Sequence, residues 1–403
     1  GMLSSLHGSA GAITALQNSV AHYYQRASSA DYLGVDPTRR SLTGTGGYVK
    51  VGRKGNAKWN FSETFTWSSP GFDLNDMGYM KETDYLMNET EIMYRQTDIW
   101  KIFRYNAFTL SQKNMWNYGG TPFSNNASLR WQSMTMNRYE WDAKETFAWN
   151  WLDSRLLRGG PDVRFGSYFL TSAKFNTDKA KRMMFMLKYE GDHNFEGNRF
   201  NTISPSLTFR LGNHVYLSGQ LDYAWNTDEM QYVATTSPLS SSSLTPYYYV
   251  MGHMDQKTYG LTLKLQVNVT PDISIQFYGA PFTSIAKYDD FKLAADTKSH
   301  TFENRFQRID PDHLTYADGV YTIGEGAGQM PFRNPDFRFN EFRSNLVARW
   351  EYLPGSTLYF VWEHRMSNRD NWYSSGWGSN LDRMWGLPAT NTFMIKMNYW
   401  FNL

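Results

Sequence analysis

The sequence predicts an all-β protein whose fold is a transmembrane, antiparallel, up-and-down β-barrel of about 16 strands. Three observations predict this fold. Apolar and polar residues alternate with a period of two along most of the chain. The connections between the alternating segments are short and long in turn. Aromatic residues make up 17% of a chain whose mean hydropathy is only -0.58.

The composition excludes several classes of protein. The 403 residues include zero cysteines, which excludes a disulfide framework and a cysteine-ligated metal. A net charge of +2 gives no reason to expect nucleic acid as a partner. No apolar run reaches the ~18 residues of a membrane-spanning helix. The start, GMLSSLHGSAG, lacks the basic and apolar regions of a signal peptide, so we expect a mature chain or one cut from a longer protein.

The first 40 residues depart from the strand pattern. Residues 1–7 have the pattern of the end of a strand, and residues 8–40 are expected to form an outer loop. Within this loop Ile13, Leu16 and Val20 recur at helical spacing, and Ser9 is placed to cap the first turn. The sequence therefore predicts one short helix in the first outer loop, within a single barrel domain over residues 1–403.

The strands are predicted from strict alternation. In residues 258–269 every second side chain is apolar, while its neighbours are Thr, Gly, Lys, Gln and Asn. The same alternation runs through residues 183–189, 215–225 and 273–277. Long strands with one apolar and one polar face suit a membrane barrel better than a soluble sheet.

The connections fall into two classes. Short turns with turn-forming residues are expected at 53–56, 96–98, 136–138, 176–179, 212–213, 270–272 and 353–356. Longer loops are expected at 69–84, 117–123, 153–161, 194–200, 235–246, 288–341 and 368–390. This asymmetry is typical of outer-membrane barrels, which have tight periplasmic turns and long extracellular loops.

The segment 288–341 is too long for a plain connector. It mixes aspartates with phenylalanines and tyrosines, which can bind sugar hydroxyls and stack on sugar rings. Two interpretations stay open for this segment. It folds into the lumen and contacts a glycan or another subunit, or it packs on itself and caps the barrel.

The C-terminal segment fixes the orientation of the barrel. In residues 391–403 one face carries Phe393, Ile395, Met397, Tyr399, Phe401 and Leu403. This face resembles the C-terminal signal strand of bacterial outer-membrane proteins, except that the final residue is Leu rather than Phe. The resemblance places the C-terminus and all the short turns in the periplasm.

Two glutamates interrupt the apolar alternation. Glu63 lies among Trp59, Phe61 and Phe65, and Glu145 lies between Trp141 and Phe147. A β-bulge or a position near the rim of the barrel would explain both residues. The alternative is that this side of the barrel contacts another protein.

The segment SPGFDLNDMGYM, residues 69–80, has acids spaced as in a calcium loop. Counted from Asp73, the residues at positions 3, 6 and 12 are Asn75, Gly78 and Asp84. Position 5 is Met77, which has no oxygen to offer, so no metal is expected. A turn explains the segment better: Pro70 and Gly71 bend the chain, Phe72 and Tyr79 anchor the loop, and Asp73, Asn75 and Asp76 cap backbone N–H groups.

Two motifs carry a resemblance to a known family. The stretch HYYQRASSADYLGVDPTRRSLTG, followed by SSPGFDLNDMGYM, is similar to segments of large outer-membrane proteins of Bacteroidota. Members of that family carry a domain like a family-nine carbohydrate-binding module ahead of a long barrel. The chain departs from the family pattern at Ala27 and Ser28, which replace Pro-Asp, and at Asp73, which replaces Glu. The resemblance implies that the binding module and further strands precede Gly1.

The resemblance also defines candidate site residues. The family-motif positions expected to contact a ligand or to mark the family are Gln25, Arg26, Asp36, Arg39, Pro70, Gly71, Phe72, Asp73, Asn75 and Asp76. Glu63 and Glu145 are the candidates for a protein interface.

No catalytic residue and no cofactor is expected. The eight histidines show no metal-binding spacing, and the Gly-rich GEGAGQM at 324–330 lacks the lysine of a phosphate loop. We therefore expect a non-enzymatic outer-membrane barrel that acts as a passage or a membrane platform in glycan handling. Its expected partners are outer-membrane lipid, lipopolysaccharide, a glycan ligand, and outer-membrane or periplasmic proteins. The alternatives are a structural subunit of a larger outer-membrane complex and, third, an outer-membrane hydrolase.

Overall fold

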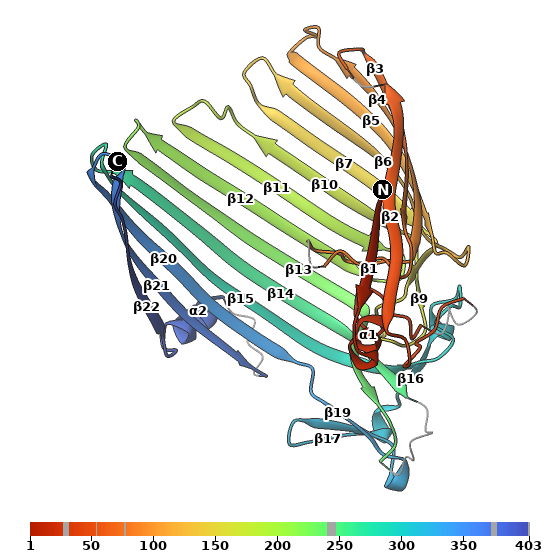
Figure 1. Cartoon of the computed structure of the whole chain (residues 1–403). Coiled ribbons are helices and arrows are strands. Elements are labelled where there is room, and N and C mark those ends of the chain that lie inside the picture. The colour runs from red at the N-terminus through yellow and green to blue at the C-terminus, as the bar shows by residue number, and fades with distance from the viewer. Residues whose placement is uncertain (27–31, 54, 76–77, 240–246, 372–376, 402–403) are drawn as a thin grey trace.

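The computed structural model describes residues 1–403 except 27–31, 54, 76–77, 240–246, 372–376 and 402–403. It consists of one 17-stranded antiparallel sheet, a three-stranded sheet, a two-stranded sheet and two α-helices (Figure 1). The prediction of an all-β fold is therefore confirmed. None of the helices in the described part of the chain is long and apolar enough to span a membrane.

The elements of the large sheet are long. Its first half consists of β1 (Met2–His7), β2 (Ser41–Arg53), β3 (Trp59–Ser68), β4 (Tyr85–Gln96), β5 (Phe103–Trp116), β6 (Pro122–Thr135) and β7 (Glu140–Trp149). Its second half consists of β10 (Tyr168–Asn176), β11 (Met183–Asn194), β12 (Arg199–Leu211), β13 (Val215–Thr236), β14 (Tyr248–Asn268), β15 (Ile273–Ala294), β16 (Phe306–Arg308), β20 (Phe337–Leu353), β21 (Ser356–Asp370) and β22 (Thr390–Asn398).

The remaining elements lie in the connections. They are α1 (Ala10–Gln17), α2 (Trp377–Trp385), the hairpin β8 (Trp151–Asp153) and β9 (Val163–Phe165), and the small sheet β17 (Leu314–Ala317), β18 (Val320–Ile323) and β19 (Met330–Arg333). Within the described residues, 3₁₀-helices span Glu303–Arg305, Pro311–His313 and Gly326–Gly328.

The large sheet is a meander. Apart from the short β16, its 16 strands (17 less one) pair in chain order from β1 to β22, each antiparallel to the next. This number agrees with the expected one. In the described part of the chain β1 pairs only with β2, and β22 only with β21, so the sheet curls but is open between these two edges (Figure 1).

The register gives the sheet two different faces. Leu217 lies opposite Leu265, and Leu265 lies opposite Phe277, so apolar side chains of adjacent strands share one face. Their neighbours Ser218 and Lys264 face each other on the other side. We call these the apolar face and the polar face. Large side chains of the apolar face are exposed, for example Trp59 at 60% and Leu221 at 52%, so no part of the described chain covers them.

The connections are sorted between the two ends of the strands. The expected short turns occur where adjacent strands end close together, at one edge of the sheet, the upper edge in Figure 1; residue 54, within the turn expected at 53–56, lies outside the described residues. The longer connections lie at the opposite edge, which we call the long-loop edge. Helix α1 forms there with Ser9 as its N-cap, as expected, because the Ser9 side chain accepts a hydrogen bond from the Ala12 N–H.

Three details of the connections differ from the sequence-based expectations. The expected loop 288–341 is shorter, because β15 extends to Ala294 and β20 begins at Phe337, and its middle forms the sheet β17 to β19. This sheet packs on itself and on the extended ends of β13 to β15, as in the second of the two interpretations left open for the segment. The connection around 153–161 contains the hairpin β8–β9, and the last long connection contains α2, which the sequence analysis did not predict.

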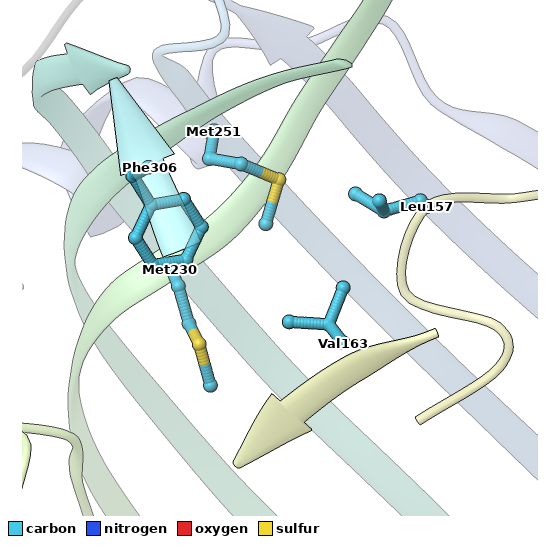
Figure 2. Close-up of a cluster of buried hydrophobic side chains, with 5 residues drawn as sticks. All are labelled: Leu157, Val163, Met230, Met251 and Phe306. Atoms are coloured by element: carbon cyan, nitrogen blue, oxygen red, sulfur yellow. The ribbon is translucent and has the colours of Figure 1, made fainter. Parts of the chain in front are cut away.

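The long-loop edge has its own apolar core. Leu157 and Val163, from the connection between β7 and β10, pack against Met230 of β13, Met251 of β14 and Phe306 of β16 (Figure 2). These residues are at most 8% exposed. Because Leu157 and Val163 belong to the connection between β7 and β10, the cluster joins this loop to the long-loop ends of β13 and β14 and to β16, which are distant from β7 and β10 in the sequence.

A buried arginine stabilises the same region. The Arg305 guanidinium, 1% exposed, donates to both carboxylate oxygens of Glu196 over 2.7 and 3.0 Å. It also donates to the carbonyl oxygens of Ser299 and Arg164 over 2.8 and 2.7 Å. The Arg164 N–H in turn donates to the Thr297 carbonyl over 2.9 Å. Arg305 thus joins the segments around Arg164, Glu196 and Ser299, through a bidentate ion pair and two further hydrogen bonds of its guanidinium.

We expect the substitution Arg305→Ala to destabilise the long-loop edge by about 3 kcal/mol, because it leaves the Glu196 carboxylate, only 12% exposed, without its charged partner. Thermal unfolding and limited proteolysis of the 295–308 segment measure this effect. Arg308→Ala is the control, because the Arg308 side chain is 77% exposed and its ion pair with Asp290 spans 3.7 Å. Equal stability and equal cleavage of the two variants would contradict this role of Arg305.

Candidate functional site

The family-motif residues come together at the long-loop edge. The 69–73 segment lies against β2, where the Ser69 N–H donates to the Thr45 carbonyl over 2.8 Å and the Thr45 N–H donates to Ser69 Oγ over 2.7 Å. The Phe72 ring is buried over Gly46: a Cβ at Gly46 would lie 2.3 Å from it. A Cβ at Gly71 would lie 2.3 Å from the Thr43 carbonyl oxygen. Glycines are needed here because the two backbones approach so closely.

Gly46 also shows which side of the sheet the loop occupies. In the pairing of β1 with β2, Leu42, Gly44 and Gly46 alternate with Thr43 and Thr45. The even-numbered residues of this part of β2 belong to the polar face. The SPGF segment therefore folds onto the polar face of the sheet, and the expectation that Phe72 anchors the loop is confirmed.

A buried histidine links this segment to the first loop. His22 is 2% exposed, with Nδ1 3.0 Å from the Pro70 carbonyl oxygen and Nε2 3.0 Å from Asp73 Oδ2. A carbonyl only accepts, so Nδ1 carries a proton, and the pair of His22 Nε2 and Asp73 shares a second one. The Thr83 hydroxyl lies 3.4 Å from Nδ1. The pair closes the two motif loops on each other and leaves Asp73 unavailable to a metal.

A second buried carboxylate holds the end of the same loop. Asp84 is 1% exposed and accepts hydrogen bonds from Arg26, from the Tyr32 hydroxyl over 2.7 Å and from the Tyr118 N–H over 3.1 Å. Its φ of 62° is in the left-handed region, an unfavourable conformation for a residue other than glycine. Burial and the hydrogen bond to Asp84 raise the pKa of Tyr32 well above its usual value. Burial likewise raises the pKa of Tyr24 to about 12.

The other motif positions make local contacts. The Gln17 side chain donates to the Asp36 carbonyl over 2.9 Å and accepts from the Asp36 N–H over 2.8 Å, which ties α1 to the end of the first loop. Hydrogen bonds from the hydroxyl and N–H of Thr38 lower the pKa of the Asp36 carboxyl. Arg39 lies 3.9 Å from Asp36, and the Gln25 side chain donates to the Asn18 carbonyl over 3.3 Å.

The turn expected at 69–80 is present in part. Asp73 Oδ1 accepts from the Asn75 N–H over 2.8 Å, and Asn75 Oδ1 accepts from the Met80 N–H over 3.1 Å, so these two caps are confirmed. The expectation for Tyr79 is wrong, because its side chain is 87% exposed and anchors nothing. Asp76 lies outside the described residues. The described residues contain no group of three or more His, Asp or Glu side chains that could hold a metal ion.

The motif loops enclose only a small cavity. It is lined by His22, Arg26, Asp84, Arg155 and Asp162, among others, and its volume is about 40 Å³. This volume is near that of a single water molecule in the liquid, roughly 30 Å³. The carboxylates of Asp73 and Asp84 are already engaged with His22 and Arg26. The arrangement locks the loops together and leaves no room for a sugar.

Contacts continue from the motif loops to the apolar core of the long-loop edge. Arg155 donates to Glu82 over 2.7 Å, and Gly159 lies against the Gln25 side chain. We call the described residues of 8–40, 69–84, 151–167 and 295–308 the loop layer.

Neither His22 nor the pair of Arg305 and Glu196 was identified from the sequence, although His22 begins the HYYQR stretch of the family motif. Residues so far apart in the sequence form no local pattern from which their pairing could be predicted.

The candidate interface residues lie elsewhere. Glu63 is exposed on the apolar face, opposite Val51 and Thr90. Glu145 lies on the same face and accepts a hydrogen bond from the Thr171 hydroxyl over 2.7 Å. The register runs through both positions without a shift, so a β-bulge explains neither. Both also lie inside their strands rather than at the strand ends.

We expect His22→Leu to destabilise the two motif loops by about 3 kcal/mol, because it leaves the Asp73 carboxylate buried and unpaired. Thermal unfolding and proteolysis within 8–40 and 69–84 measure the change. The double variant His22→Leu with Asp73→Asn should recover part of the loss, since no buried charge then remains. His214→Gln, at an exposed histidine of the short-turn edge, is the control. Wild-type proteolysis of His22→Leu would contradict the link.

The comparisons with known proteins give a family and no function. No curated protein and no solved structure is similar to the chain. One family model, described as "Domain of unknown function (DUF5916)", matches residues 8–403. Since the match covers nearly the whole chain, including the motif loops and the sheet from β2 to β22, the chain belongs to the DUF5916 family.

Proposed function

We propose that this chain is a non-enzymatic outer-membrane β-barrel protein of a Gram-negative cell of the Bacteroidota type. It acts as a passage or a membrane platform in glycan handling, with its C-terminus and short turns in the periplasm and its long loops outside the cell. Lipid and lipopolysaccharide surround its apolar face. The observation that supports this proposal best is the exposed apolar face of the 16-strand meander.

The height of the apolar face fits a bilayer. In β14 the apolar face carries Tyr259, Leu261, Leu263, Leu265 and Val267, and Val269 follows the strand directly. The ten residue steps from 259 to 269 cover about 33 Å at ~3.3 Å per residue. With strands tilted by about 40°, this length gives an apolar band of about 25 Å, the height seen in outer-membrane barrels. In β13 the corresponding span from Val215 to Trp225 is equally long.

Aromatic residues mark both limits of the band. Towards the short turns the apolar face carries Trp59, Tyr94, Trp141 and Trp350. Towards the long-loop edge it carries Trp67, Trp116, Trp149 and Trp225. Trp and Tyr concentrate where a bilayer meets water, because their rings are apolar at one end and can donate a hydrogen bond at the other.

The polar face suits a wet interior. It carries ion pairs across neighbouring strands, such as Arg130 with Asp142, and within one strand, such as Lys188 with Glu190 over 2.7 Å. Arg343 and Arg365 both approach Glu341, at 2.8 and 3.0 Å. Charges of both signs would line water in a passage, while the loop layer restricts access at the long-loop edge. The loop layer thus supports either a gated passage or a platform.

Conductance in planar bilayers separates the passage from the platform. We expect the wild-type protein to insert and to conduct weakly, because the loop layer is closed. Arg305→Ala should raise the conductance, since it releases the 295–308 segment. Insertion without current in either variant would contradict the passage and leave the platform. A soluble monomer that needs no detergent would contradict the barrel itself.

A second candidate function is a structural subunit of a larger outer-membrane complex, because one sector of the apolar face is polar. On the neighbouring strands β3 to β6 this sector comprises Glu63, Asn88, Thr90, Gln112, Asn114 and Asn125. Most of the sector lies between the aromatic levels of Trp59 and Trp67, within the height of the band. Polar groups at that depth are costly in lipid and are satisfied by a protein neighbour. A partner that offers hydrogen-bond donors would suit this surface.

The double variant Glu63→Leu with Gln112→Leu tests the polar sector. If a protein covers the sector, co-purification of that partner in mild detergent should be lost while membrane insertion is kept. The control is Ser344→Leu, on the apolar face of β20 and outside the sector. If the sector faces lipid instead, no partner is lost and the variant gains about 1 kcal/mol or more of stability, because a charge has left the band.

A further inference from the structure

A cavity larger than that of the motif loops lies beside the loop layer. It is enclosed by the hairpin β8–β9 on one side and by the long-loop ends of β10 to β13 on the other, and its volume is about 140 Å³. At roughly 30 Å³ per water molecule this is the space of four or five waters, close to one monosaccharide ring. None of the motif residues lines it. It is therefore a separate site.

One wall of the cavity is aromatic. The Trp151 ring lies 5.0 Å from the Tyr168 ring and 5.7 Å from the Phe165 ring, measured between centroids. Phe200 adds a fourth ring that is partly exposed. The C–H face of a sugar ring packs against surfaces of this kind, because it is apolar while the hydroxyls point outward in the ring plane.

The facing wall supplies hydrogen-bond acceptors. Asp192 of β11 and Asp228 of β13 both line the cavity. Among the described residues Asp192 has no side-chain partner, and Asp228 accepts a single hydrogen bond, from the Met230 N–H over 2.9 Å. Three of the four carboxylate oxygens are therefore available to a ligand. Asn194 and Asn226 add amide groups to the same wall.

The protein keeps these two carboxylates at an electrostatic cost. Burial raises the pKa of Asp192, and the nearby Asp228 carboxylate adds to this effect. Burial also raises the pKa of Asp228. Neither side chain has an ion pair in the described structure, in contrast to the buried carboxylates of Asp73, Asp84 and Glu196. Two neighbouring carboxylates that line a cavity and have no ion-pair partner among the described residues are typical of a binding site.

We propose that this cavity binds one sugar ring of a glycan, which packs against Trp151 and Tyr168 and donates its hydroxyl hydrogens to Asp192 and Asp228. Carboxylates accept such hydrogen bonds strongly, because the acceptor is charged. A metal ion fits the cavity less well, since no group of three or more His, Asp or Glu in the described residues could hold one. The proposal rests on the proposed role in glycan handling and gives that role a site.

The test is ligand binding by the full chain in detergent, with a panel of neutral mono- and disaccharides and with calcium chloride as separate probes. Saturation-transfer NMR detects weak saccharide binding, and calorimetry gives the affinity. Asp192→Asn and Asp228→Asn preserve the volume of the cavity and should each weaken saccharide binding by about tenfold or more, the loss of one charged hydrogen bond. Trp151→Ala should weaken it as well.

Asp272→Asn is the matched control, because Asp272 is exposed in the short turn between β14 and β15, at the edge of the sheet opposite the cavity, and does not line it. It should bind saccharide as the wild type does. Absence of saccharide binding by the wild type, equal binding by Asp192→Asn and Asp228→Asn, or binding of calcium alone would overturn the proposal. Bilayer insertion by a protein that binds no saccharide would overturn only this site, whereas a soluble monomer would overturn the membrane function.

Discussion

The alternation of side chains along antiparallel strands is the constraint on which the rest of the structure depends. A strand places successive side chains on opposite faces, so a register shift of one residue would exchange all apolar and polar positions of a strand. The pairing of β13, β14 and β15 keeps Leu217, Leu265 and Phe277 in one row. One face of the sheet is therefore mostly apolar, with polar residues in the sector around Glu63 and Gln112 and at positions such as Glu145 and Ser344.

Because of this constraint, the buried ion pairs and the cavity lie at the long-loop edge rather than within the sheet. Within the sheet each side chain lies on one face or the other. The short turns have too few residues to form further packed structure. The loops between β1 and β2, β3 and β4, β7 and β10, and β15 and β20 are free to fold on each other instead. His22 and Arg305 fix them there through buried pairs with Asp73 and Glu196. The described residues of these loops thus form one layer, and the cavity of Asp192 and Asp228 lies next to it.

The alternation made much of the fold predictable from the sequence. The order of the strands, the seven short turns and the helix capped by Ser9 all follow from local patterns. The helix α2 and the strands β17 to β19 do not, because they depend on packing against the sheet. The buried pairs were beyond sequence reasoning for a similar reason: Arg305 and Glu196 are 109 residues apart, and His22 and Asp73 are 51 apart.

The candidate site was predicted less well than the fold. The family-motif residues come together at the long-loop edge, but Asp73, Phe72 and Arg26 hold loops together rather than line an open site. The residues that line the larger cavity gave no signal in the sequence, since Asp192 and Asp228 lie within alternating strands like other polar positions. Only the folding of β8–β9 over the sheet brings Trp151 to them.

The most direct test of the central claim is a spin-label scan of β14. The chain has zero cysteines, so single cysteines at successive positions from 259 to 268 can each carry one label without further changes. In proteoliposomes we expect collision with oxygen, which concentrates in lipid, to be high at the odd positions and low at the even ones. A water-soluble nickel chelate should not reach the odd positions. Equal access of the chelate to odd and even positions would contradict a lipid-facing apolar face.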